Sequence, residues 1–472
     1  MSVNAVRSTA KTVVSGRLTN LVEKVNLSYG SALACLAIGV LGYTAALPAG
    51  PLVTAAMVVT TFEFIRRLDV GLPLLQITAL LAVLQWLVGP TITYFTGMTL
   101  SRYRMYVPEP DYYAYAIPGT MNFCAGLYVF GATIRQKYVL RLLDRRHFVE
   151  FGLLLNAVGI FAIFAAPRAP GGAQFLLFLL SQLKYVGAIY FLLSRHQYRY
   201  VFAGLSCLQL VTTSAESGLF HQLIIWLMLI STYWFAQYSL EFLQKLFVIG
   251  VAFAGVFVIQ VVKQDFREKR DRGVATSVVS ELFLVVGGQR SLVERDVLAL
   301  ASVRLNQGWI ISAVMRHVPE GEPYAKGKTV QDALVASFLP RFLAPNKRRA
   351  GGQEYFRRFT GMPIAEGTSM GISPLGEAYA NYGPNGGVVF MAVYGLAFGC
   401  LFRLTVRSVA KRPDFAFWLP LIFYQGIKAE TEISVVLNQV SKGALVAYLG
   451  YYGLTQHVYP AIFGKPYRIL RE

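Results

Sequence analysis

The densest group of residues whose types could carry chemistry is a run of cations between residues 341 and 358. Its members are Arg341, Lys347, Arg348, Arg349, Arg357 and Arg358. Arginine presents a planar, permanently charged fork that pairs with two phosphate oxygens at once, so the run suits an anionic partner such as a lipid pyrophosphate head group. Arg341 stands between a proline and apolar residues rather than among other charges, which makes it the strongest candidate. A solvated basic patch, or contact with anionic lipid, would show the same charges.

Two carboxylates and one histidine near this run could move a proton. Glu366 and Glu377 belong to a stretch of small and hydroxyl residues that predicts tight turns with exposed backbone N–H groups, and either carboxylate could accept a proton. A turn that merely re-enters the membrane would show the same glycines. His317 is the only histidine between residues 263 and 383 and could act as a base near neutral pH, although a lone histidine is also common as a hydrogen-bonded surface group.

Several kinds of site lack their expected signals. The chain contains no HExxH, no GxSxG, no GxxxxGK[ST] and no cluster of metal ligands, so the signals of a zinc protease, a serine hydrolase and an ATP-driven pump are missing. Four cysteines, Cys35, Cys124, Cys207 and Cys400, lie in apolar blocks without CxxC spacing, which supports neither a disulfide framework nor a metal site. We therefore expect no metal and no cofactor.

The elements that must position these residues are membrane-spanning helices. Of 472 residues, 15% are charged and 55% are hydrophobic, and the mean hydropathy is +0.48. The apolar residues form blocks of about 16 to 22 residues, which is the length that a helix needs to cross the hydrocarbon of a bilayer. The net charge of +19 first indicates sorting of charge across the bilayer in such a protein, so it requires no nucleic acid partner.

The predicted fold class is an all-α polytopic membrane protein with about 12 transmembrane helices. The spans are expected near residues 29–47, 51–66, 72–95, 118–134, 149–166, 173–193, 199–215, 219–237, 243–262, 384–404, 414–430 and 441–460. They divide the chain into a cytoplasmic segment (1–28), a bundle of about nine helices (29–262), a large outer loop (263–383), about three further helices (384–460) and a cytoplasmic tail (461–472). The outer loop is too long to lack structure, so it should fold mostly as helices.

Charge in the connecting segments predicts the orientation. With the N-terminus inside, the inner segments hold about 20 Lys and Arg, whereas the short outer loops hold Arg102, Arg104 and Arg168. Both termini should then be cytoplasmic, and residues 263–383 should lie outside. The first ten residues of this loop are themselves basic, but long loops translocate largely regardless of charge. A shorter outer loop is expected at 101–118.

Lys184 lies near the middle of an expected span, where an ionisable group is costly and faces a polar cavity or a partner. It could contact a phosphate, pair with Glu63 or Glu216, or extend to the membrane surface. Three further charges stand at the outer end of another span, and they are Lys428, Glu430 and Glu432.

Three motifs between residues 332 and 395 resemble those of a known family. They are PRFLAPNK at 340–347, TSMGISPLGEAYANYG at 368–383 and a glycine-rich run at 386–399. With them the chain resembles the polytopic oligosaccharide repeat-unit polymerases of O-antigen and exopolysaccharide export, the Wzy-type family. The layout of many spans and one large, late outer loop is similar as well.

The resemblance implies a metal-independent glycosyltransferase, related to the GT-C membrane enzymes, at the outer face of the bacterial inner membrane. Such an enzyme moves the growing chain from its undecaprenyl pyrophosphate onto the non-reducing end of an incoming repeat unit. A cationic site must hold the departing pyrophosphate, and a base must take the proton of the acceptor hydroxyl. The expected partners are the lipid-linked oligosaccharide, the lipid bilayer and, among proteins, a chain-length regulator and a flippase.

The matching motif positions assign roles to residues of this chain. The residues carried over to the pyrophosphate site are Arg341, Lys347, Arg348 and Arg304. The residues carried over as the base are Glu377 and Glu366, beside the independent candidate His317. The family often uses paired arginines in two outer loops, and here only Arg102 and Arg104 are available as the second pair.

Two rival functions remain open. An O-antigen ligase-like glycosyltransferase shares the layout and the donor but hands the glycan to a different acceptor. A lipid-linked oligosaccharide flippase or other transporter should show repeated halves, broken helices in matching positions and no large folded outer loop, and the sequence predicts the reverse.

Overall fold

The structure is a computed structural model, and it describes residues 28–97, 103–130, 139–141, 143–217, 220–252, 254–255, 305–338, 352–365, 368, 370–409 and 412–467. These residues form helices, turns and loops, and they contain no strand. The all-α prediction is therefore confirmed for the part of the chain that the structure describes.

The helices of the first half are α2 (Tyr29–Tyr43), α3 (Ala49–Arg67), α4 (Leu74–Val83), α5 (Gly89–Thr96), α6 (Glu109–Val129), α8 (Phe148–Ala165), α9 (Gly171–Ser181), α10 (Leu183–Leu193), α11 (Arg199–Ser217) and α12 (His221–Phe235). A further apolar helix covers Phe242–Ala252. Those of the second half are α16 (Gly308–His317), α17 (Lys328–Phe338), α18 (Gln353–Thr360), α19 (Ser373–Val409), α20 (Leu419–Phe423), α21 (Ile433–Gly453) and α22 (Tyr459–Phe463). Short π or 3-10 turns are η1 (Leu84–Val88), η2 (Arg145–His147), η3 (Ala166–Arg168), η4 (Pro413–Trp418), η5 (Tyr424–Ile427) and η6 (Leu454–Val458).

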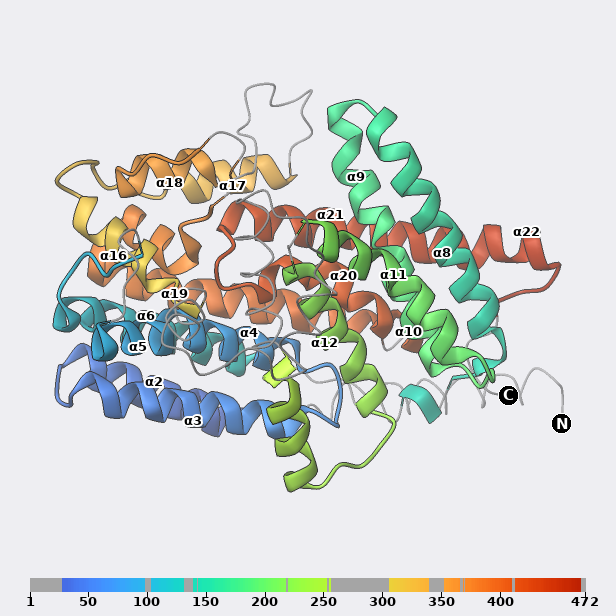
Figure 1. Cartoon of the computed structure of the whole chain (residues 1–472), viewed down its shortest axis with the longest axis horizontal. Coiled ribbons are helices and arrows are strands. Elements are labelled where there is room, and N and C mark those ends of the chain that lie inside the picture. The colour runs from blue at the N-terminus through green and yellow to red at the C-terminus, as the bar shows by residue number, and fades with distance from the viewer. Residues whose placement is uncertain are drawn as a thin grey trace, which may run out of the picture.

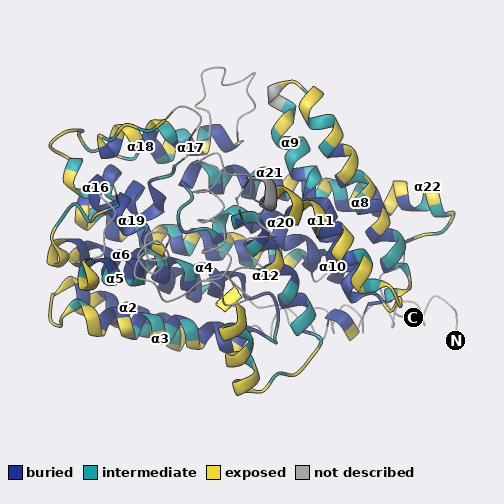
Figure 2. Cartoon of the chain, viewed as in Figure 1, coloured by how far each residue is buried: buried dark blue, intermediate teal, exposed yellow. Residues whose placement is uncertain are grey.

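Six helical stretches are long and apolar enough to cross a membrane. They are Ala49–Arg67, Leu74–Thr96, Arg145–Arg168, Ala173–Leu193, Ser373–Val409 and Ile433–Phe463. Three shorter apolar helices are Tyr29–Tyr43, His221–Phe235 and Phe242–Ala252. Large apolar side chains such as Val58, Phe62 and Phe161 are exposed, as a protein surrounded by lipid requires. Exposed residues lie along the outer faces of α2 and α3 in Figure 2. The chain therefore has the helices of a membrane protein.

Helix α6 packs between α2 and α19, and the three run side by side (Figure 1). Glycines allow the close approach on both sides. A Cβ atom at Gly42 of α2 would lie 2.5 Å from Ile117 Cγ2 of α6, and one at Gly395 of α19 would lie 2.3 Å from the carbonyl oxygen of Phe123. Small residues at such contacts let helix backbones meet closely, which is how helices associate where lipid is the solvent.

Three helices begin before the spans that the sequence predicts. Helix α6 starts at Glu109 rather than near residue 118, α19 at Ser373 rather than 384, and α21 at Ile433 rather than 441. The predicted loop at 101–118 is therefore wrong for residues 109–118, and the predicted tight turns at 366–383 are wrong for residues 373–383, because both stretches are helical. Ser373 Oγ accepts the Gly376 N–H at 3.2 Å and Pro374 follows, which together form a strong helix start. The bend in α19 comes at Gly383, whose φ is +69°, immediately before Pro384.

One expected span is not a single helix. The stretch at 414–430 consists of η4, α20 and η5, whereas the expected span at 173–193 is present as Ala173–Leu193, with one turn residue, Gln182, between α9 and α10. Side chains satisfy the carbonyls that the break at 414–430 frees. Tyr233 donates to the oxygen of Ala416 at 2.6 Å, and Gln439 Nε2 donates to that of Leu421 at 2.6 Å. Buried irregular backbone requires such partners, and the sequence predicted no break here.

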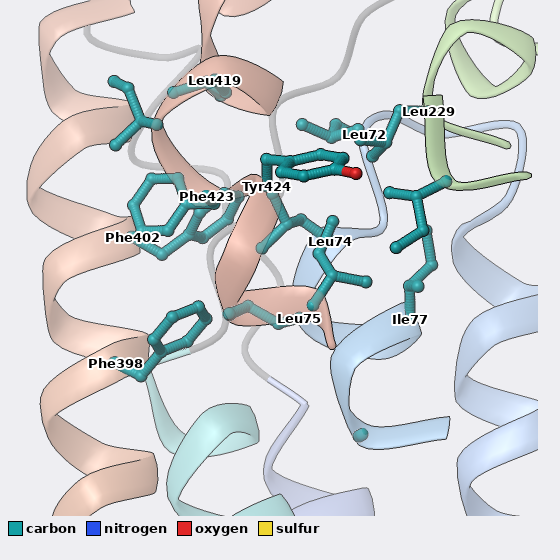
Figure 3. Packing of buried hydrophobic residues seen from close by; sticks show 14 of the residues in the cluster. Leu72, Leu74, Leu75, Ile77, Leu229, Phe398, Phe402, Leu419, Phe423 and Tyr424 are labelled. Atoms are coloured by element: carbon teal, nitrogen blue, oxygen red, sulfur yellow. The ribbon is translucent and has the colours of Figure 1, made fainter. Parts of the chain in front are cut away.

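The broken segment lies inside the apolar core of the bundle. Its residues Leu419, Phe423 and Tyr424 pack between α19, which contributes Phe398 and Phe402, and the first turn of α4 with Leu229 of α12 (Figure 3). All residues of α20 are buried, and most of the ribbon around it is drawn as buried in Figure 2. This packing connects the C-terminal helices with the N-terminal ones.

One buried ion-pair cluster holds the C-terminal end of α3 in place. Glu63 is fully buried, and its carboxylate pairs with Arg66 at 2.6 Å and with Arg67 at 3.2 Å. It also accepts hydrogen bonds from the hydroxyls of Ser28 and Ser31. Because this carboxylate is fully engaged, the alternative in which it pairs with Lys184 is wrong.

Replacing Glu63 by glutamine should destabilise the protein strongly. The buried Arg67 would lose its counter-charge, which costs about 3 kcal/mol of unfolding free energy. Thermal unfolding of the purified protein in detergent measures the effect, with Glu320→Gln at an exposed position as the matched control. Equal unfolding temperatures for Glu63→Gln and the control would show that the cluster does not support the fold.

Candidate functional site

The described part of the expected outer loop packs over the first turns of α19 through an apolar cluster of its own. The buried members of this outer cluster are Trp309, Ile310, Val314, Val318, Tyr355, Phe356, Phe359, Ile372 and Ala380. They join α16, α18 and the start of α19, and Tyr103, Met105 and Tyr106 pack against them. The loop before α6 and the end of α16 therefore share one surface.

This surface brings two exposed arginines to one aromatic ring. The guanidinium carbon of Arg104 lies 5.3 Å from the centre of the Tyr106 ring, and that of Arg316 lies 5.9 Å from the same centre. The Tyr106 N–H donates to Ser312 Oγ at 3.1 Å, which holds the loop on α16. Neither guanidinium forms an ion pair with a carboxylate of the described residues. Two arginine forks of this kind suit an anion with several oxygens, such as a phosphate or pyrophosphate.

Arg104 was expected at a pyrophosphate site, but its neighbour Arg316 was not. The sequence places Arg316 in the last turn of an amphipathic helix, where a cation commonly interacts with the helix dipole. Its approach to Tyr106 joins residues more than 200 positions apart, so spacing along the chain gives no signal of it. Only the immediate neighbour His317 marked the position as functional.

Two cations of the expected basic run have structural partners. Arg358 Nε lies 2.6 Å from Glu322 Oε1, and Arg357 Nη2 donates to the carbonyl oxygen of Ile364 at 2.7 Å. These contacts hold α18 to the segments on either side of it. Their charge is therefore less available to a ligand than that of Arg104 and Arg316.

His317 is half-buried at the end of α16, and two glycines enclose its ring. A Cβ atom at Gly321 would lie 2.1 Å from His317 Cε1, and one at Gly361 would lie 2.8 Å from the same atom. The ring forms no hydrogen bond with a described residue. A positioned imidazole with a free nitrogen can accept a proton from a substrate hydroxyl.

Glu377 lies at a junction of three helices and is fully buried. Thr329 Oγ1 of α17 donates to Oε1 at 2.6 Å, and the Ile433 N–H at the start of α21 donates to Oε2 at 3.0 Å. Asn381 Nδ2 donates to Thr329 Oγ1 and to the Glu377 carbonyl oxygen, each at 2.7 Å. Both carboxylate oxygens are engaged, so this arrangement favours His317 over Glu377 as the group that meets a substrate.

The other six predicted site residues lie outside the described residues. They are Arg341, Lys347, Arg348, Arg304, Arg102 and Glu366. The described residues contain no group of three or more His, Cys, Asp or Glu that could hold a metal ion. The described site thus offers Arg104 in the loop before α6 and Arg316 at the end of α16 as two cations at one ring, and His317 next to Arg316 in the chain as a base.

Comparison with known proteins identifies a family whose description names no activity. Residues 110–404 match a family described as a domain of unknown function (DUF8712). No curated protein and no solved structure matches the chain.

Removing the Thr329 hydroxyl should weaken the junction around Glu377. Thr329→Val removes the hydroxyl that donates to Glu377 Oε1 and accepts from Asn381 Nδ2. We expect the loss of these two hydrogen bonds to lower the unfolding free energy by about 2 kcal/mol. Thr329→Ser keeps the hydroxyl and is the matched control. Thermal unfolding of both variants in detergent tests the prediction, and a valine variant as stable as the serine variant would contradict it.

Proposed function

Since the chain belongs to the DUF8712 family, whose description names no activity, we propose its function from its own residues: it polymerises undecaprenyl-pyrophosphate-linked oligosaccharide repeat units into O-antigen or exopolysaccharide. The proposal includes a bundle of about 12 transmembrane helices with a GT-C-like arrangement. It places the protein in the bacterial inner membrane, with both termini cytoplasmic and residues 263–383 at the outer face.

The single observation that carries the proposal is the pair of exposed guanidiniums at Tyr106. Arg104 and Arg316 come from two segments that the sequence assigns to the outer face, and both are exposed. A pyrophosphate that leaves from a sugar gains charge as the bond breaks, so fixed cations at its oxygens lower the barrier. The sequence resemblance independently suggests a lipid pyrophosphate donor.

The reaction needs one bond formed, one bond broken and one proton moved. The acceptor hydroxyl oxygen attacks the anomeric carbon of the growing chain, and the bond from that carbon to the pyrophosphate oxygen breaks. The electron pair leaves with the lipid pyrophosphate, whose oxygens Arg104 and Arg316 hold. The hydroxyl proton passes to a base, for which His317 is the described candidate with an accessible ring, and Glu366 and Glu377 are the alternatives.

Neutralising both guanidiniums tests the proposal in cells. With Arg104→Gln plus Arg316→Gln as the only copy, we expect long surface chains to fall roughly tenfold or more, because each charge-assisted hydrogen bond contributes about 1.5–3 kcal/mol. Single repeats should still reach the surface. Gel separation of the surface polysaccharide by length measures both.

Arg407→Gln is the matched control, because Arg407 is exposed near the opposite end of α19. Normal chain length in the double variant, at a normal amount of protein in the membrane, would contradict the Arg104 and Arg316 assignment. Loss of all surface glycan, single repeats included, would indicate a ligase-like enzyme. Unchanged chain length after deletion of the whole gene would exclude a polymerase.

A further inference from the structure

One buried amide links the segments that carry the two cations of the candidate site. Asn306, two residues before α16, is only 1% exposed. Its Oδ1 accepts the Trp309 N–H at 3.2 Å, and its Nδ2 donates to Thr93 Oγ1 of α5 at 2.8 Å and to Met105 Sδ at 3.5 Å. Because a backbone N–H can only donate, the amide oxygen must face Trp309 and the NH2 group must face the other two partners. One side chain therefore joins α16, α5 and the loop before α6.

Asn306 holds the start of α16 in place. A side-chain oxygen that accepts the N–H three residues later is the geometry of a helix N-cap, and here that N–H belongs to Trp309. The backbone beside it is tightly packed, because a Cβ atom at Gly89 of α5 would lie 2.5 Å from the carbonyl oxygen of Leu305. Helix α16 has ten residues and is therefore about 15 Å long. The direction of its start accordingly determines where Arg316, in its last turn, lies.

The same amide holds the loop that carries Arg104. Met105 accepts the hydrogen bond from Asn306, and the Tyr103 ring meets the Trp309 ring edge-on, with the centres 5.1 Å apart. Arg104 stands between these two anchored neighbours, while its own side chain is exposed. The backbone of Arg104 is thus tied to the first turn of α16 from both sides.

We infer that Asn306 is a positioning residue for the anion site at Arg104 and Arg316, an inference that rests on the proposed function. Its buried side chain does not meet the ligand. It sets the position of one guanidinium relative to the other, although the two come from segments about 200 residues apart. Cations that are already in place lose little conformational entropy when the anion binds, so they hold it more tightly than cations on a free loop.

Binding of radiolabelled inorganic pyrophosphate to the full-length protein in phosphatidylcholine nanodiscs tests the inference. Asn306→Ser is the first variant, because serine still caps a helix but carries no amide NH2 to donate to Thr93 and Met105. We expect at least fivefold weaker binding. Asn156→Ser is the matched control and should bind as wild type, because the Asn156 amide donates to the Gly152 carbonyl oxygen within α8.

The same substitution in an Arg104→Gln protein separates positioning from a general loss of structure. If Asn306 acts through Arg104, Asn306→Ser should change the remaining pyrophosphate affinity, which Arg316 provides, by less than twofold. A purely structural role would weaken binding equally in both backgrounds. If Asn306→Ser does not fold, Thr93→Val removes only the α5 partner of the amide, and we expect at least twofold weaker binding, again only where Arg104 is present.

The outcomes distinguish this inference from the proposed function. Wild-type affinity in the folded variants, or equal weakening with and without Arg104, would overturn the positioning role while the anion site itself stands. A folded wild-type protein that does not bind pyrophosphate would contradict the anion site, and with it both the observation that carries the proposed function and the role of Asn306.

Discussion

The arrangement of α17, α19 and α21 depends on one buried carboxylate where these three helices meet. Glu377 of α19 accepts the hydroxyl of Thr329 in α17 and the N–H of Ile433 at the start of α21. A helix start carries partial positive charge, so it stabilises this carboxylate. Without these donors a buried charge would cost several kcal/mol, and α17 and α21 must therefore stay seated on α19. Helix α16 packs on the same part of α19, so the junction also determines where Arg316 and His317 lie.

Positively charged side chains occupy two kinds of environment in this protein, one exposed and one buried. On the outer cluster, Arg104 and Arg316 are exposed beside Tyr106, where an anion can arrive from solution or from the membrane surface. Inside the bundle, Lys184 is buried, and its Nζ lies 4.8 Å from the centre of the Tyr185 ring. Part of the net charge of +19 is therefore held at fixed positions beside aromatic rings.

The sequence predicted the helical class and most helix positions, because apolar runs of bilayer length leave few alternatives. It did not predict the early starts of α6, α19 and α21, because their first turns carry polar or charged residues such as Glu109, Asp111 and Glu377, which lower the local hydropathy. Ser373 followed by Pro374 is a sequence pattern typical of a helix start, but the span was predicted from hydropathy, which places its start later. Of the candidate site, His317 was found by residue type, and Arg104 through the resemblance to a family with paired arginines in two outer loops. Arg316 was not, because its contact with Tyr106 arises only from tertiary packing.

The function that we propose for this chain is the joining of lipid-linked repeat units. The measurement that tests it most directly uses the purified protein in nanodiscs with an undecaprenyl-pyrophosphate-linked repeat unit as the only substrate, and separates the products by mass. We predict a ladder of whole-number multiples of the repeat, one undecaprenyl pyrophosphate released for each bond formed, and loss of the ladder in His317→Ala. Unreacted substrate with folded wild-type protein, or single repeats moved across the membrane without any joining, would contradict the account.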